Sequence, residues 1–279
     1  MLPSQPERIW AAVKERSMAT RATRRKSKET QLSSPEYRRP LRIVPLHTAP
    51  RISSTTPPEL TYRNGPLLTS AQVFTLFWGS AWRAATNSPL MTHMNDFFDF
   101  VLTSKLIDQL AEYNVPGKSI GHGARTGTAV LTTSEPGKTV TDVAIQKMLQ
   151  AEVSSGTLPA NTPNSLCFVF LPPGTQVDQG GAKSCQTFCG YHDATSDNIF
   201  YAVMPYPGCT GCEGGLALPD ALTSTSSHEL CEAITDPIPG TGWYDDANGE
   251  IGDICAWKTK TLGPYTVQLE WSNSADACV

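Results

Sequence analysis

From about residue 60 onward, the pattern of apolar and polar residues predicts strands that alternate with helices along the chain. Continuous apolar runs predict buried strands at residues 73–78, 166–171 and 199–204. Apolar residues spaced three and four positions apart predict helices over residues 90–113 and 141–153. Shorter strands are expected at residues 128–133 and 265–271. Strands that alternate with helices predict one α/β domain with a mixed β-sheet and packed helices.

The first part of the 279-residue chain differs from the rest. Residues 1–51 hold 12 Lys/Arg and 4 Asp/Glu, whereas the remaining residues hold 10 Lys/Arg and 22 Asp/Glu. We therefore predict a basic, disordered tail or linker over residues 1–56 and a folded domain over residues 57–279. The acidic balance of the domain argues against a nucleic-acid surface on it. The chain has no apolar run long enough to span a membrane.

The cysteines all lie in the C-terminal half of the chain. They are Cys167, Cys185, Cys189, Cys209, Cys212, Cys231, Cys255 and Cys278. Their even number predicts disulfides that brace this half, and hence a secreted protein, although the first forty residues contain no apolar stretch typical of a signal peptide. We expect Cys231 to pair with Cys255 or Cys278. A structural zinc site in the four cysteines from Cys185 to Cys212 is an alternative.

The segment HELCE at residues 228–232 lies in a stretch expected to be helical until the residue before Pro237. His228 and Glu232 are four residues apart and therefore share one face of that helix. This pair and a third, downstream ligand can hold zinc and leave one position open for water. Glu229 would then act as the general base. The segment resembles a zinc-hydrolase motif in which glutamate replaces the second histidine.

The distance along the sequence does not identify the third zinc ligand as clearly as it identifies His228 and Glu232. We expect Glu250, because a thermolysin-like hydrolase also brings a glutamate from a later element after a similar gap. Asp253 is expected to orient a ligand or to exchange roles with Glu250, and Asp236 is a further candidate. Tyr244 is predicted to donate a hydrogen bond to a developing oxyanion.

Other interpretations remain open at this point. A His-Glu-x-x-Glu segment alone is weak support for a metal site. A calcium site is an alternative because the following loop is rich in oxygen ligands, although its glycines do not fit the EF-hand pattern. Those ligands are Asp245, Asp246, Asn248, Glu250 and Asp253. The remaining candidates, His122 and His192, are interpreted as ordinary hydrogen-bonding residues, with His192 beside a cysteine pair where it could line a cleft.

Several segments occur in one order that is typical of a known family. They are residues 60–68, 185–192, 209–214, 228–232, 243–255 and 265–271. With these segments the chain resembles the EXORDIUM or phosphate-induced protein 1 family of plant extracellular proteins and their microbial relatives. The resemblance implies a secreted protein with disulfides, and it supports His228, Glu232, Glu250 and Asp253 as one unit. The chain departs from the family in its basic tail, where a signal peptide is usual, and in a shorter loop at residues 209–219.

Together these observations predict a zinc-dependent hydrolase, specifically a metallopeptidase, on a single zincin-like α/β domain. Its substrate would be a peptide or protein. Zinc would be bound by His228, Glu232 and Glu250 with support from Asp253, while Glu229 and Tyr244 would act in catalysis. The alternative is a non-catalytic extracellular binding protein of the cell wall or of signalling, in which a metal only braces the fold.

Overall fold

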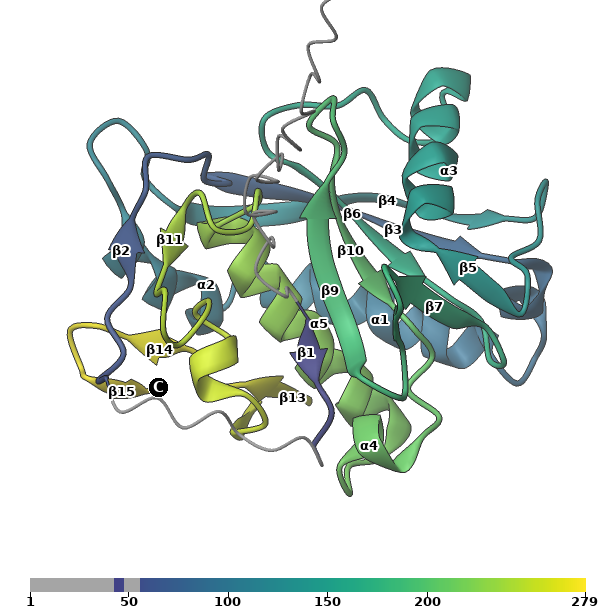
Figure 1. The fold of residues 1–279 in the computed structure, drawn as a ribbon. Helices are drawn as coiled ribbons and strands as arrows, with labels where there is room; N and C mark the ends of the chain where they lie inside the picture. The colour runs from purple at the N-terminus through teal and green to yellow at the C-terminus, as the bar shows by residue number, and fades with distance from the viewer. Residues whose placement is uncertain (1–42, 48–55) are drawn as a thin grey trace, which may run out of the picture. The chain divides into compact units, whose positions relative to one another are not determined.

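A six-stranded mixed sheet with the strand order β1-β9-β10-β6-β3-β4 lies at the centre of the structure (Figure 1). The structure, a computed structural model, describes residues 43–47 and 56–279, which belong to one compact unit. The strands β10, β6, β3 and β4 are mutually parallel, whereas β9 runs antiparallel to β10 and β1 runs antiparallel to β9. The bounds of these strands are β1 (Val44–Pro45), β3 (Ser70–Trp78), β4 (Gly121–Leu131), β6 (Ser165–Phe170), β9 (Phe188–Ala194) and β10 (Phe200–Met204).

Helices cover both faces of this sheet, which explains why its central strands are continuous apolar runs. The helices are α1 (Ser88–Val101), α2 (Lys105–Gln109), α3 (Asp142–Ser155), α4 (Thr210–Glu213) and α5 (Leu218–Thr235). In β6, Phe168 and Phe170 pack in the cluster that contains buried residues of α1, α2 and α5. The alternate residues Cys167 and Val169 pack in the second cluster, with α3. Accordingly, α3 lies on the opposite side of the sheet from α1 and α5 (Figure 1).

The mixed sheet and the alternation of strands and helices agree with the sequence, but one predicted helix is divided. In place of a single helix over residues 90–113, α1 ends at Val101 and α2 begins at Lys105. Ser104 separates them, because its backbone is extended and its side chain accepts a hydrogen bond from the backbone N–H of Leu106. This is an N-cap, and it begins a new helix. A 3₁₀ turn, Leu110–Tyr113, follows α2.

The sheet also contains two strands that were not predicted. The first, β9, begins within the cysteine-rich segment, and the second, β1, belongs to the predicted tail. The side chain of Val44 is buried, and Val44 pairs with Gly190 of β9, so residues 43–47 are part of the fold. The rest of the predicted tail, except residue 56, lies outside the described residues.

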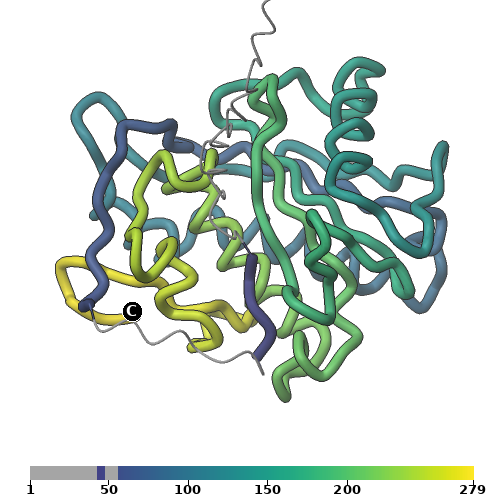
Figure 2. The backbone as a smooth tube through the Cα atoms, in the orientation of Figure 1, coloured from purple at the N-terminus to yellow at the C-terminus, as the bar shows by residue number. Residues whose placement is uncertain are grey.

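Smaller sheets surround the central one. They are formed by β2 (Thr61–Tyr62) with β11 (Trp243–Tyr244), β5 (Thr139–Thr141) with β7 (Gln176–Gln179) and β8 (Ala182–Lys183), β12 (Thr259–Leu262) with β13 (Tyr265–Gln268), and β14 (Trp271–Ser272) with β15 (Ala277–Cys278). The C-terminal strands lie beside the start of the domain (Figure 2), where Leu60 and Asn273 exchange two hydrogen bonds of 3.0 and 2.8 Å. The hairpin β12–β13 packs on α5, and the backbone N–H of Gln268 donates to Ser227 Oγ at 2.9 Å.

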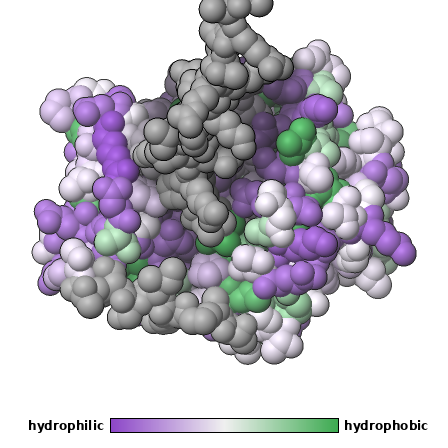
Figure 3. Space-filling view, viewed as in Figure 1, coloured by the Kyte–Doolittle hydropathy of each residue, from purple (hydrophilic) through white to green (hydrophobic). Residues whose placement is uncertain are grey.

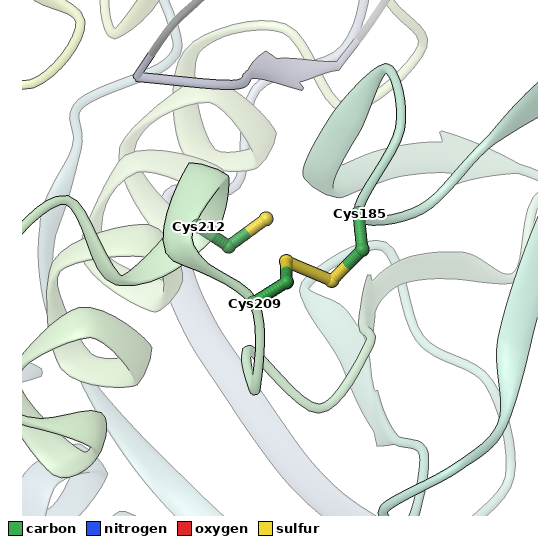
Figure 4. A group of neighbouring side chains, drawn as sticks. All are labelled: Cys185, Cys209 and Cys212. Atoms are coloured by element: carbon green, nitrogen blue, oxygen red, sulfur yellow. A yellow bond between two sulfur atoms is a disulfide. The ribbon is translucent and has the colours of Figure 1, made fainter.

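Three disulfides brace the C-terminal half of the chain. They are Cys185–Cys209, Cys189–Cys212 and Cys255–Cys278. Figure 4 shows the first of these bonds with Cys212 beside it. Because all four cysteines of the alternative zinc site are in disulfides, they offer no thiolate ligands. The predicted pairing of Cys231 is wrong, since Cys255 and Cys278 bond to each other and Cys231 is a buried free thiol on α5.

The described residues include no helix that is both long enough and apolar enough to cross a membrane. Where residues are coloured in Figure 3, hydrophilic and intermediate residues surround small, separate apolar areas. The three disulfides and this surface are compatible with a secreted protein.

Candidate metal centre

The helix α5 carries ionisable side chains into the interior of the protein. All of its residues from Ala221 to Thr235 are buried, because the central sheet packs on one side and the β12–β13 hairpin on another. His228 and Glu229 are 0% exposed, and Glu232 is 1% exposed. Burying a charged group costs free energy unless a partner or a metal ion compensates the charge. The groups that surround these three side chains therefore determine whether their charges are compensated by protein partners or by a metal ion.

The first cluster contains His228, Glu232 and Asp253. His228 Nε2 lies 2.9 Å from Glu232 Oε1 and 3.9 Å from Asp253 Oδ1. One ligand atom from each residue lies within 4.8 Å of the other two. Although the first distance is short, His228 Nε2 makes no directional hydrogen bond with any described residue. Ligand atoms that lie this close together can also hold a shared cation, which would replace the proton between His228 and Glu232.

The imidazole of His228 is held in position at Nδ1, the nitrogen that faces away from Glu232. Gln268 Nε2 lies 2.8 Å from His228 Nδ1 and donates to the carbonyl oxygen of Gly252 at 2.9 Å. A Cβ atom at Gly252 would lie 2.8 Å from the imidazole ring. With a donor facing Nδ1, the ring proton lies on Nε2. Cation binding at Nε2 therefore requires the proton on Nδ1 and a rotated Gln268 amide that accepts it through Oε1. This rotation would replace the bonds of Gln268 to the carbonyl oxygen of Gly252 and to the backbone N–H of Trp257.

Gly252→Ala is expected to weaken divalent-cation affinity by about 10- to 100-fold, because the added methyl group displaces the ring that Gln268 orients. Zinc titration against a chelating dye would measure this affinity. Gly121→Ala is the matched control, because there the nearest atom to the new Cβ is the backbone oxygen of Thr69 at 3.9 Å. Equal affinities in the two variants would show that the position of His228 does not matter for binding.

The second cluster is centred on His192 of β9, which is 0% exposed. His192 Nδ1 lies 3.1 Å from Glu229 Oε2 and 3.4 Å from Glu232 Oε2. His192 Nε2 lies 3.5 Å from Glu250 Oε1 and 3.1 Å from the backbone carbonyl oxygen of Asp236. His192, Glu232 and Glu250 form a second group whose ligand atoms all lie within 4.8 Å of one another. Glu232 therefore belongs to both clusters.

The close approach of β9 to α5 depends on a glycine. Gly190 and His192 are two positions apart on β9, so both side chains belong to the same face of the strand. A Cβ atom at Gly190 would lie 2.8 Å from Thr225 Cγ2 and 3.1 Å from Glu229 Oε1. This position therefore needs glycine for β9 to bring His192 against the carboxylates of α5.

Burial and mutual repulsion shift the pKa values of these carboxyl groups. Burial raises the pKa of Glu229, Glu250 and Asp253, and the nearby charge of Glu232 raises all three further, with Asp253 reaching about 8. Burial acts in the same sense on Glu232, but both histidines oppose it and lower its pKa to about 2.

The same contacts act on the histidines. Burial alone would lower the pKa values of His192 and His228, but the surrounding carboxylates raise both well above the usual value. In the metal-free protein the two clusters therefore retain protons that a bound cation would displace.

The structure gathers the predicted ligands but groups them differently. Asp253, rather than Glu250, lies with His228 and Glu232, while Glu250 lies with His192. Asp253 reaches this position because its backbone N–H donates to Glu232 Oε1 at 3.1 Å. His192 was expected beside a cysteine pair, where it could line a cleft, and was interpreted as an ordinary hydrogen-bonding residue. In the structure it contacts the carboxylates of Glu229, Glu232 and Glu250.

Three other predicted residues have different surroundings. The carboxylate of Asp236 accepts hydrogen bonds from the backbone N–H groups of residues 240, 241 and 242, so this side chain folds the turn after α5 and lies in neither cluster. Asp245 likewise accepts backbone N–H donors, those of residues 59, 247 and 248. The exposed Asp246 pairs with Arg63 at 2.8 Å. Of the four acidic residues considered for calcium, Glu250 and Asp253 belong to the clusters.

Tyr244 lies near the centre without belonging to either cluster. Its side chain is buried, and the guanidinium of Arg63 lies 4.6 Å from the centroid of its ring. Burial raises the pKa of Tyr244, and the charges of Glu250 and Asp253 raise it further. The phenol therefore stays protonated and can donate a hydrogen bond.

Comparison with known protein families and with curated proteins found no match for this chain.

Proposed function

We propose that this protein is a zinc-dependent hydrolase that cleaves peptide bonds, with a zincin-like arrangement of ligands on one helix. The observation that carries this proposal is the cluster of His228, Glu232 and Asp253, with Glu229 adjacent on the same helix. One imidazole and two carboxylates are suitable donors for zinc. His228 Nε2, which is buried beside Glu232 Oε1 but makes no directional hydrogen bond with a described residue, is the atom expected to bind the ion.

Asp253 is the most exposed member of this cluster. The Asp253 side chain is 19% exposed, whereas those of His228 and Glu232 are 0% and 2% exposed. A catalytic zinc site needs one position open to water or substrate, so the side of Asp253 is the one from which a substrate would approach. Bound zinc would supply a Lewis acid that polarises a carbonyl group and lowers the pKa of water.

Glu229 is suited to proton transfer. His192 holds one of its oxygens, Oε2, at 3.1 Å, while Oε1 is buried without a partner among the described residues. Burial also raises the pKa of Glu229, which favours a carboxylate that accepts a proton and later releases it. Glu229 would take a proton from the attacking water and give it to the leaving amine. Tyr244 would donate a hydrogen bond to the oxygen that becomes negatively charged.

A second candidate function is supported by the burial of the centre. The side chains of His192, Glu229 and Glu250 are each only 1% exposed, as expected for a metal that braces a fold. In that case the protein would be a non-catalytic extracellular binding protein, consistent with its resemblance to EXORDIUM-type proteins and with its three disulfides. Under this alternative, removal of the metal would lower the melting temperature, and no hydrolysis would be detected.

The test combines metal analysis with a general protease assay on the purified protein. We expect bound zinc, and hydrolysis of a fluorescent casein that stops with a chelator and returns with zinc. Asp253→Asn should weaken zinc affinity by about 10-fold or more, since it removes a charged ligand. Asp246→Asn is the matched control, because that side chain is 90% exposed and lies in the same loop. Zinc that survives Asp253→Asn unchanged would contradict the ligand assignment.

A further inference from the structure

We infer that the centre holds two divalent cations, bridged by the carboxylate of Glu232. The inference rests on the proposed function for the first cation, at His228, Glu232 and Asp253. The second cation would be bound by His192, Glu232 and Glu250. Both groups have ligand atoms within 4.8 Å of one another.

The two oxygens of Glu232 point to different histidines. Oε1 lies 2.9 Å from His228 Nε2, and Oε2 lies 3.4 Å from His192 Nδ1. A carboxylate held between two imidazoles in this way can offer one oxygen to each of two ions. Paired metal ions in hydrolases lie about 3.5–4 Å apart, a separation that one carboxylate can bridge.

An unpartnered atom at the second position also indicates a ligand. Glu250 Oε1 is buried and lacks a hydrogen-bond partner among the described residues. The ring nitrogen His192 Nε2 lies 3.5 Å from it. A buried carboxylate oxygen that is left unsatisfied is costly, and a bound cation would remove that cost.

The hydrogen bonding of His192 also leaves a position for a cation. Nε2 lies 3.1 Å from the carbonyl oxygen of Asp236, so Nε2 must carry a proton to donate to it. Nδ1 lies 3.1 Å from Glu229 Oε2 and 3.4 Å from Glu232 Oε2, so a positive charge is needed between these atoms. A proton on Nδ1 supplies that charge in the metal-free protein, and a cation bound to Nδ1 would take its place. A metal ligand whose other ring nitrogen donates to a backbone carbonyl is the usual arrangement for histidine.

Charge compensation is compatible with a second ion. Besides the four carboxylates of the centre, Glu270 is fully buried and neither of its side-chain oxygens has a hydrogen-bond partner among the described residues. Each divalent cation compensates two negative charges that are otherwise left to protons in the interior.

The experiment measures zinc per chain by elemental analysis after the full chain has been loaded with Zn²⁺ and dialysed. We expect two zinc ions in the unchanged protein and one in each of the variants His192→Ala and His228→Ala. Glu232→Gln should reduce the content below one, because it weakens both positions. Asp246→Asn, which lies outside the centre, should keep two. Circular dichroism would show that each variant is folded.

The outcomes separate the two proposals. A single zinc that His228→Ala removes and His192→Ala retains would overturn the second cation and leave the proposed function intact. No zinc in the unchanged protein would overturn both proposals. A measurement that needs no variant is the electron paramagnetic resonance spectrum after loading with Mn²⁺. Exchange-coupled ions support the bridged pair, and the spectrum of isolated ions overturns it.

Discussion

Glu229→Gln is expected to slow hydrolysis by about 10²- to 10⁴-fold while leaving the zinc content unchanged. The amide has nearly the same shape as the carboxylate but cannot accept a proton from water. Glu229 Oε2 lies 3.1 Å from His192, and an amide there can keep that contact, so the fold should persist. The measurements are the rate of casein hydrolysis and the zinc content of the same sample.

The matched control is Glu152→Gln. Glu152 is a partly exposed residue of α3, on the opposite face of the sheet from α5, so the same chemical change there should leave the rate unaltered. A Glu229→Gln variant that binds zinc and retains its full rate would exclude Glu229 as the general base. A variant that loses both zinc and activity would show that Glu229 acts as a ligand.

The chelated protein should become less stable as the pH rises from about 5 to about 8, with a fall in melting temperature of about 10 °C. Asp253 has a folded-state pKa of about 8, above its unfolded value, and the pKa values of Glu229 and Glu250 are also raised. The folded protein therefore binds more protons than the unfolded chain in this range. Stability falls as those protons are released.

His192 and His228 also make the folded protein less stable as the pH rises. The raised pKa values of His192 and His228 contribute stability below their unfolded value, and that stability is lost as the pH rises through the folded value. Glu232, whose pKa is lowered to about 2, contributes stability that is lost only at more acidic pH.

Differential scanning calorimetry with and without zinc would measure this change of stability with pH. Zinc-loaded protein should not lose stability over this range, because cations replace the protons. Identical pH profiles would argue against cations at the centre.

Local spacing was sufficient to identify the helical part of the centre. His228 and Glu232 are separated by four residues, so helix geometry alone places them together. Pro237 likewise marked the end of α5, which the structure places at Thr235. Asp253 was named as a ligand candidate but could not be separated from Glu250. Which of two acids three residues apart faces His228 depends on the conformation of their loop.

Contacts between residues far apart in the sequence could not be predicted from local spacing. His192 and Glu229 are 37 residues apart, and they meet because β9 runs antiparallel to β10 and approaches α5 at a glycine. The spacing of two residues between Gly190 and His192 could have indicated that both face α5, but only if residues 188–194 had first been predicted as a strand. The disulfide pairing could not be predicted from the sequence for the same reason, because it also depends on long-range contacts. The Cα atoms of Cys255 and Cys278 lie 5.7 Å apart only once the C-terminal hairpins are folded.

The pairing of β1 with β9 has a practical consequence for shortened forms of the protein. An unpaired edge strand exposes backbone N–H and C=O groups that promote association with other chains. A protein that begins at residue 57, the start suggested by composition, would lose Val44 and expose the outer edge of β9. It would be prone to self-association along the strand that carries His192. Expression trials should therefore begin no later than residue 43.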